Sequence, residues 1–205
     1  MNKNEQEIEV KFYLNDIKGF EKRLIAQGAT LVHPRIHEAN LRFDTPDGDL
    51  SRDFRVLRLR RDSRIYLTYK DLADPKQTVS VRREIEFEVS DFDAARSFLE
   101  ALGFTATIFY EKYRTTYTLA DSLVTLDEMP FGSFTEIESK DPGSIRKLAE
   151  ILSLKWETRC TDSYMMLFDR LKQNTGISAS NLSFDELGRY SISAEDLGLS
   201  PADIP

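Results

Sequence analysis

The stretch EIEVK at residues 7–11 alternates charged side chains with aliphatic ones. A β-strand sends residues i and i+2 to the same face, so this stretch predicts a strand with one ionic face and one apolar face. Two further stretches repeat the alternation, RLR at residues 58–60 and EIE at residues 136–138. Because some of these strands are acidic and others are basic, we expect their ionic faces to point toward each other.

Length and composition exclude several classes of protein. A chain of 205 residues favours one domain with a core of its own, and its net charge of −7 weighs against a general surface for nucleic acid or anionic membrane. Cys160 is the only cysteine and His33 and His37 are the only histidines, which argues against a disulfide or a cysteine zinc site. No apolar run reaches the ~20 residues of a membrane span and no secretory signal opens the chain, so we expect a cytoplasmic protein without membrane contact.

Hydrophobic periodicity predicts the remaining elements. Helices are expected at 15–28, 91–103, 143–153 and 161–173, and strands at 5–13, 36–44, 54–61, 64–70, 78–89, 107–119, 122–127 and 133–138. Asp91 and either Asn15 or Asp16 are expected to cap helices. Many hairpins with few helices favour an antiparallel sheet or barrel.

The end of the chain differs in character. Residues 174–205 are rich in Ser, Asp, Gly and Leu, with weak periodicity, and residues 71–77 are expected to be a polar loop. We therefore predict a main domain at 1–173 and, at 174–205, a loosely structured tail or a short helical appendage. Residues 185–187 and 194–197 are each expected to start a single helical turn.

Seven of the predicted strands carry charges on one face. One such strand alone is typical of a solvent-exposed sheet. Like charges, however, are segregated onto separate strands, which favours the inside of a closed barrel whose apolar faces are covered by helices. Paired carboxylates without His or Cys favour Mg²⁺ or Mn²⁺, whereas Arg and Lys bind phosphate oxygens. Both groups are the parts that phosphoryl transfer needs.

In this order along the chain, the motifs resemble the CYTH superfamily, the triphosphate tunnel metalloenzymes, which include class IV adenylate cyclases and thiamine triphosphatases. The motifs are EIEVK at 7–11, LRLR at 57–60, Lys70, RREIE at 82–86, Lys112-x-Arg114, Asp127 and FTEIE at 134–138. The resemblance covers about residues 5–170. It implies an α+β fold, an antiparallel eight-stranded tunnel barrel with helices packed outside.

The resemblance also implies roles for the charged residues. The expected metal ligands or their neighbours are Glu7, Glu9, Asp127, Glu136 and Glu138, with Asp127 alternatively orienting an arginine. The expected phosphate binders are Lys11, Arg58, Arg60, Lys70, Arg82, Lys112 and Arg114, of which Lys11, Arg58, Arg60, Lys112 and Arg114 are also expected to be catalytic. The roles of Glu84, Glu86 and Glu88 are left open between metal, water and neighbouring arginines, and Arg61 and Arg83 are expected on the opposite face.

The implied function is that of a Mg²⁺- or Mn²⁺-dependent enzyme acting on a small triphosphate, which is ATP, thiamine triphosphate or tripolyphosphate. We place an adenylate cyclase that forms cyclic AMP and pyrophosphate first, a triphosphatase second, and a non-catalytic polyphosphate-binding module third. Residues 2–6 lack the His-Phe element that precedes Glu-x-Glu-x-Lys in some class IV cyclases, so cyclisation and hydrolysis both stay open. The acidic charge weighs against long RNA as substrate, and a homodimer is left open.

Overall fold

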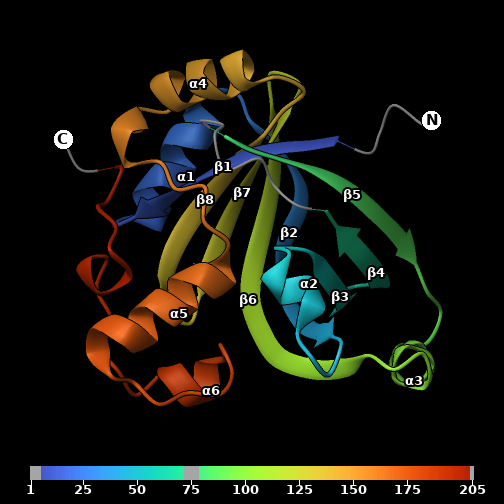
Figure 1. Cartoon of the computed structure of the whole chain (residues 1–205). Coiled ribbons are helices and arrows are strands. Elements are labelled where there is room, and N and C mark those ends of the chain that lie inside the picture. Colours follow the sequence, from blue (N-terminus) through green and yellow to red (C-terminus); the bar gives the residue numbers. More distant parts are fainter. Residues whose placement is uncertain (1–5, 72–78, 204–205) are drawn as a thin grey trace.

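A closed barrel of eight antiparallel strands forms the centre of the computed structural model, which describes residues 6–71 and 79–203 (Figure 1). Around the barrel the strands follow the order β1-β5-β4-β3-β2-β6-β7-β8. The predicted α+β class and tunnel barrel are confirmed. The strands are β1 (Gln6–Leu14), β2 (Thr30–Asp44), β3 (Val56–Arg61), β4 (Ile65–Lys70), β5 (Ser80–Glu88), β6 (Thr105–Leu119), β7 (Ser122–Met129) and β8 (Gly132–Glu138).

Helices lie outside the barrel, as Figure 1 shows. The apolar faces of β1, β7 and β8 pack under α1 and α4 in one core cluster, and α3 packs on β3 and β6. Asp16 and Asp91 cap α1 and α3, accepting hydrogen bonds from the amides of Gly19 (2.9 Å) and Ala94 (2.7 Å). The helices are α1 (Ile17–Ala26), α2 (Asp49–Arg52), α3 (Phe92–Ala101), α4 (Pro142–Ile151), α5 (Tyr164–Thr175) and α6 (Phe184–Leu187), with 3₁₀ turns η1 (Trp156–Thr158) and η2 (Glu195–Leu197).

Three elements differ from the prediction: the start of β2, the short helix α2 and the 3₁₀ turn η1, of which the last two were not predicted. The β2 strand begins at Thr30 instead of residue 36. Its register against β6 shifts twice around Pro34, which has no amide hydrogen for the ladder, and this irregularity interrupts the alternation that the prediction needed. At the start of α2, the Asp44 carboxylate accepts hydrogen bonds from the amides of Leu50 (2.8 Å) and Ser51 (2.9 Å). Of the polar loop predicted at 71–77, all but Asp71 lies outside the described residues.

The chain after α4 adds backbone hydrogen bonds to two strands of the barrel, β1 and β6. Among the described residues β5 pairs with β1 as far as Glu9, and Cys160 then pairs with Lys11 through two backbone hydrogen bonds of 3.1 and 2.8 Å. In the same way, the pairing of β7 with β6 begins at Tyr113. Before that point in β6, the Leu182 amide donates to the backbone oxygen of Phe109, and the Leu182 carbonyl accepts from the amide of Glu111, both at 3.1 Å. One end of the barrel therefore contains strand partners from the C-terminal part of the chain.

Residues 174–203 pack mainly against α5 and reach the barrel strands at Leu182 and Ala202. The two expected helical turns are present as α6 and η2, and Leu182, Leu187 and Leu197 are fully buried with residues of α5. The Asp203 carboxylate accepts from the amides of Asn15 and Asp16, both at 2.8 Å. The segment is thus not loose, and its separation from 1–173 as an appendage stays a prediction. Within the described part of the chain, no helix combines the length and the apolar character that crossing a membrane requires.

Candidate functional site

The barrel interior contains a cavity of about 630 Å³, which is the size of a typical small-molecule site. All eight strands contribute side chains to its wall. The alternation predicted from sequence holds in three dimensions, since Ile8 and Val10 pack outward in the core while their charged neighbours point inward. The predicted site residues on this wall are Glu7, Glu9, Lys11, Arg58, Arg60, Lys70, Arg82, Lys112, Arg114, Glu136 and Glu138.

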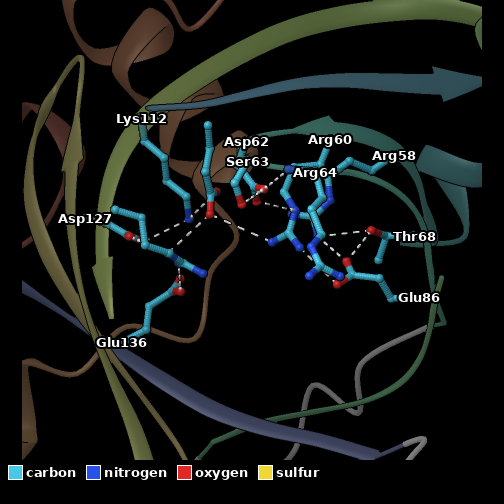
Figure 2. A network of polar contacts seen from close by, with 12 residues as sticks. Arg58, Arg60, Asp62, Ser63, Arg64, Thr68, Glu86, Lys112, Asp127 and Glu136 are labelled. Atoms are coloured by element: carbon cyan, nitrogen blue, oxygen red, sulfur yellow. Dashed lines mark hydrogen bonds and ion pairs between the residues drawn. The ribbon is translucent and has the colours of Figure 1, made fainter. Parts of the chain in front are cut away.

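Asp127 is the one predicted site residue that does not line the cavity. It is fully buried, and its carboxylate accepts two hydrogen bonds from Arg114 (2.6 and 2.5 Å), one from Lys112 Nζ (3.0 Å) and one from the Tyr164 hydroxyl (2.8 Å). Figure 2 shows Asp127 beside Lys112 and Glu136 on one side of the cavity. Because its oxygens are already occupied by these donors, we assign it the orienting role, holding the Arg114 guanidinium in a fixed plane.

A second cluster lies across the cavity in Figure 2. Glu86 accepts hydrogen bonds from Arg58 (3.3 Å), Arg60 (3.0 Å) and the Thr68 hydroxyl (2.6 Å). Of the three glutamates whose role the sequence left open, Glu86 therefore serves the arginines. Glu88 lies outside the cavity and pairs with exposed Arg64 at 2.8 Å. Arg61 packs over the Phe92 ring, 5.0 Å from its centroid, on the outer face that the alternation predicted.

A third region has more carboxylates than cations. Lys70 Nζ contacts both oxygens of Glu7 at 2.7 and 2.6 Å, and Glu84 at 3.4 Å. Glu9 lies directly opposite Glu138 in the register of β1 and β8. Burial, together with repulsion from Glu7 and Glu9, raises the pKa of Glu138 to about 7. The negative charge in this region is thus only partly neutralised by the protein.

Glu136 differs from Glu138, although the two are neighbours on the same face of β8. Burial alone would raise the pKa of Glu136, but Lys11, Arg114 and Lys112 hold it well below its usual range. Lys11 Nζ lies 3.2 Å from Glu136 and 3.6 Å from Glu9. Lys11 therefore stands between the cation-rich part of the wall and the carboxylate-rich part.

Sequence reasoning missed the charged face of β2. Glu38, Asn40 and Arg42 alternate just as the recognised motifs do, so the signal was available. The Glu38 carboxylate is only 3% exposed and lies 3.5 Å from Lys112 and 3.8 Å from Arg60. Burial would raise the pKa of Glu38, but these cations and Arg114 lower it to about 2.

Two tyrosines were also missed. Tyr110 lies on the same face of β6 as Lys112, so alternation again carried the signal. Tyr164 comes from α5, and its ring packs against Lys11 Nζ at 5.0 Å and Lys112 Nζ at 5.4 Å. Nothing in the local sequence of an amphipathic helix indicates that contact.

The carboxylates of the third region are the type of ligand that a hard cation prefers, but they are not arranged around a single point. Across residues 6–71 and 79–203, no three His, Cys, Asp or Glu side chains converge closely enough to hold a metal ion. Glu7, Glu9 and Glu138 nevertheless supply the oxygen donors and the surplus negative charge that Mg²⁺ and Mn²⁺ prefer. A metal at these residues is therefore a proposal that depends on some rearrangement of side chains.

A closed antiparallel barrel with cations and carboxylates on its inner wall defines a tunnel-type site for an anionic ligand. The family model described as CYTH domain matches residues 5–159, and the chain belongs to this family. CYTH proteins process triphosphates.

Solved structures with the same fold agree with this assignment. A Pyrococcus horikoshii protein is 29% identical with a TM-score of 0.67, covering 80% of this chain and 99% of its own. A proposed adenylate cyclase from Vibrio parahaemolyticus is 21% identical with a TM-score of 0.69, covering 80% and 98%. A proposed adenylyl cyclase from Hippeastrum, described as having a dominant triphosphatase activity, is 21% identical with a TM-score of 0.59, covering 80% and 95%. No curated protein matches the chain.

Proposed function

We propose that this protein is a divalent-metal-dependent enzyme that hydrolyses a small triphosphate inside the barrel. The observation that carries the proposal is the separation of charge along one cavity wall. Arg60, Lys112 and Arg114 approach Glu38 from the two sides of the cavity, with Arg58 next to Arg60. Glu7, Glu9 and Glu138 repel one another in another part of the wall. A triphosphate bound to a metal ion is complementary to both parts of the wall, because its phosphates would pair with the cations and its metal with the carboxylates.

The cations would bind and align the phosphate chain. Arg114 is oriented by Asp127, so its remaining donor face is fixed before a ligand arrives. Arg58 and Arg60 are held in the same way by Glu86. Side chains that need no reorganisation on binding are the most effective stabilisers of charge that develops during reaction.

The carboxylates would hold the metal. Glu7, Glu9 and Glu138 are the main candidates, and Glu136 can join them once phosphate competes for Lys11 and Arg114. A bound Mg²⁺ or Mn²⁺ would neutralise charge on the phosphoryl group that is transferred. Lys11, which lies between the carboxylates and the cations, would contact a phosphoryl group of the ligand.

Adenylate cyclisation, which the sequence motifs placed first, is the second candidate. Hydrolysis needs only the charged parts that the wall supplies, whereas cyclisation also needs a surface that holds ribose and adenine so that the 3′-hydroxyl reaches the α-phosphorus. The likeness in fold to the proposed Vibrio cyclase supports cyclisation, and the triphosphatase activity of the Hippeastrum protein supports hydrolysis.

Product analysis distinguishes the two reactions. The protein is incubated with tripolyphosphate, thiamine triphosphate or ATP, each with Mg²⁺ or Mn²⁺ and each with a chelator control. Hydrolysis releases orthophosphate from tripolyphosphate or thiamine triphosphate faster than from ATP. Cyclic AMP and pyrophosphate from ATP, with no cyclic product from 3′-deoxy-ATP, would establish the cyclase. No turnover of any of the three substrates would overturn both.

A further inference from the structure

One amide side chain, that of Asn40, is buried inside the barrel without a hydrogen-bond partner among the described residues. Asn40 is 0% exposed, and within the described part of the chain neither its side-chain oxygen nor its nitrogen is hydrogen-bonded. In the register of β2, Asn40 lies opposite Tyr110 on β6 and Arg60 on β3, both of which line the cavity. Asn40 therefore faces the interior between them. A buried amide with donors and acceptor unused costs roughly 1–3 kcal/mol, which calls for a ligand or water at this position.

Arg42, two residues along the same face, is a cation in surplus. It lines the cavity, and its guanidinium donates a hydrogen bond to the backbone oxygen of Arg55 at 3.4 Å. Among the described residues no carboxylate lies within ion-pair distance of it, whereas Arg58 and Arg60 are each paired with Glu86. Burial lowers the pKa of Arg42, and repulsion from Arg58 and Arg82 adds to this effect although Tyr110 and Asp44 oppose it.

Tyr110 completes the group. Its hydroxyl accepts a hydrogen bond from Arg58 Nη1 at 3.3 Å, which leaves the hydroxyl proton free to be donated to a ligand. Burial would raise the pKa of Tyr110, but Arg58, Lys112 and Arg42 lower it, so positive charge surrounds the hydroxyl. Leu182 bonds to the backbone on both sides of Tyr110 and fixes this part of β6.

We propose that Asn40, Arg42 and Tyr110 form an additional anion subsite, next to Arg58, that takes one more phosphoryl group than a triphosphate supplies. Arg42 and Tyr110 line the cavity, and Asn40 lies buried between Tyr110 and Arg60 on the same face of the sheet. Among the described residues, none of the three is paired with a carboxylate. The inference rests on the proposed function, because it extends the same row of phosphate-binding cations. It makes linear tetraphosphate a better ligand than tripolyphosphate.

Titration calorimetry tests this subsite. For each protein it gives one dissociation constant for tripolyphosphate and one for tetrapolyphosphate, and both are measured first with EDTA and then with Ca²⁺. The site variants are Arg42→Gln and Asn40→Leu. The matched control is Arg35→Gln, on the same strand, which removes the same charge from an exposed side chain paired with Glu128. The control corrects for the stronger attraction of tetrapolyphosphate to any positive charge.

Wild type and Arg35→Gln are expected to prefer tetrapolyphosphate by about tenfold, the worth of a hydrogen bond to a charged group. In Arg42→Gln the ratio of the two dissociation constants should be close to one. The dissociation constant for tripolyphosphate itself should change less than threefold (about 0.6 kcal/mol). Asn40→Leu should lower the preference without loss of thermal stability, because it removes an unpaired amide.

The outcomes separate this inference from the proposed function. If neither polyphosphate binds, the proposed function fails and the subsite fails with it. If tripolyphosphate binds but the preference is the same in Arg42→Gln and Arg35→Gln, only the subsite is overturned. ATP binding is measured in the same way. If Arg42→Gln weakens ATP binding and leaves the polyphosphate preference intact, the group holds a nucleoside instead, which also overturns the subsite.

Discussion

Glu38 carries a negative charge in the middle of the cations that are expected to bind phosphate. An internal carboxylate at this place neutralises Lys112, Arg60 and Arg114 before any ligand arrives. When phosphate binds, those cations must share their charge between Glu38 and the ligand. Glu38 therefore stabilises the fold and at the same time limits how tightly the cavity holds an anion.

The pKa of Glu38 gives a pH-dependent prediction. It is lowered in the folded protein from 4.5 to about 2, so its stabilisation is fully present above pH 4.5 and is lost as the pH falls toward 2. At pH 7, Glu38→Gln should lower the free energy of unfolding by about 3 kcal/mol, from 1.36 kcal/mol per pKa unit. Urea unfolding at pH 7, 4 and 3 should show this penalty shrinking, with exposed Glu100→Gln as a control near zero. An equal penalty at pH 7 and 3 would contradict the assignment.

Asp127 gives a second prediction at this scale. Asp127→Asn keeps the shape but removes one of the buried carboxylates that pair with Arg114 and Lys112. Removing one member of a buried ion pair costs about 3 kcal/mol or more, and we expect KM for the triphosphate to rise because Arg114 is no longer oriented. Thermal unfolding and steady-state kinetics measure the two effects. Asp53→Asn, which removes an exposed partner of Arg55, should change neither.

The metal-binding proposal is tested at Glu9 and Glu138. Glu9→Gln and Glu138→Gln each remove one carboxylate from a group whose members repel one another, so stability should be kept or raised. Turnover at limiting Mg²⁺ should fall by roughly 100-fold, because a ligand is lost. Glu88→Gln, on a strand of the same barrel but outside the cavity, should keep its turnover. Near-wild-type activity in both site variants would exclude these residues as ligands.

At the scale of elements, the chain after α4 contributes to the barrel itself. Leu182 is fully buried and bonds to β6, while Cys160 bonds to β1. Leu182→Ala removes buried side-chain volume next to Tyr110, so we expect the free energy of unfolding to fall by about 3 kcal/mol. Denaturant unfolding measures the loss, and Leu123→Ala, a partly exposed leucine on β7, serves as the comparison. A loss below that of Leu123→Ala would show that the segment contributes little.

The strands could be predicted from sequence because polar or charged residues alternate with apolar ones within the strands, and this pattern does not depend on distant parts of the chain. The same rule identified most of the cavity wall, and it would have identified Glu38, Asn40 and Arg42 had it been applied to β2. Pro34 and two register shifts obscured the first half of that strand. Tyr164 and Leu182 could not be found in this way, because their contacts with Asp127 and β6 depend on how distant segments pack.

At the scale of the whole molecule, triphosphate and metal should bind the folded barrel and not the unfolded chain. Tripolyphosphate with Mg²⁺ should therefore raise the melting temperature, by an amount that grows with ligand concentration and corresponds to about 2.7 kcal/mol at 100 times Kd. Differential scanning calorimetry with and without each component measures the shift. Phosphate alone at equal ionic strength controls for general salt effects, and a shift no larger than this control would count against a triphosphate site.

The pairing of β1 affects the order in which the barrel can fold. β1 is the first strand in the chain, yet its partners are β5 and β8, so both of its edges stay unpaired until residues near 80–83 and 133–138 have been synthesised. Contacts between segments so far apart in sequence are typical of slow folding. On the ribosome, the nascent chain would present an alternating strand with two open edges during this interval. Mispairing with another chain is then most probable at β1, and the charges of EIEVK oppose it.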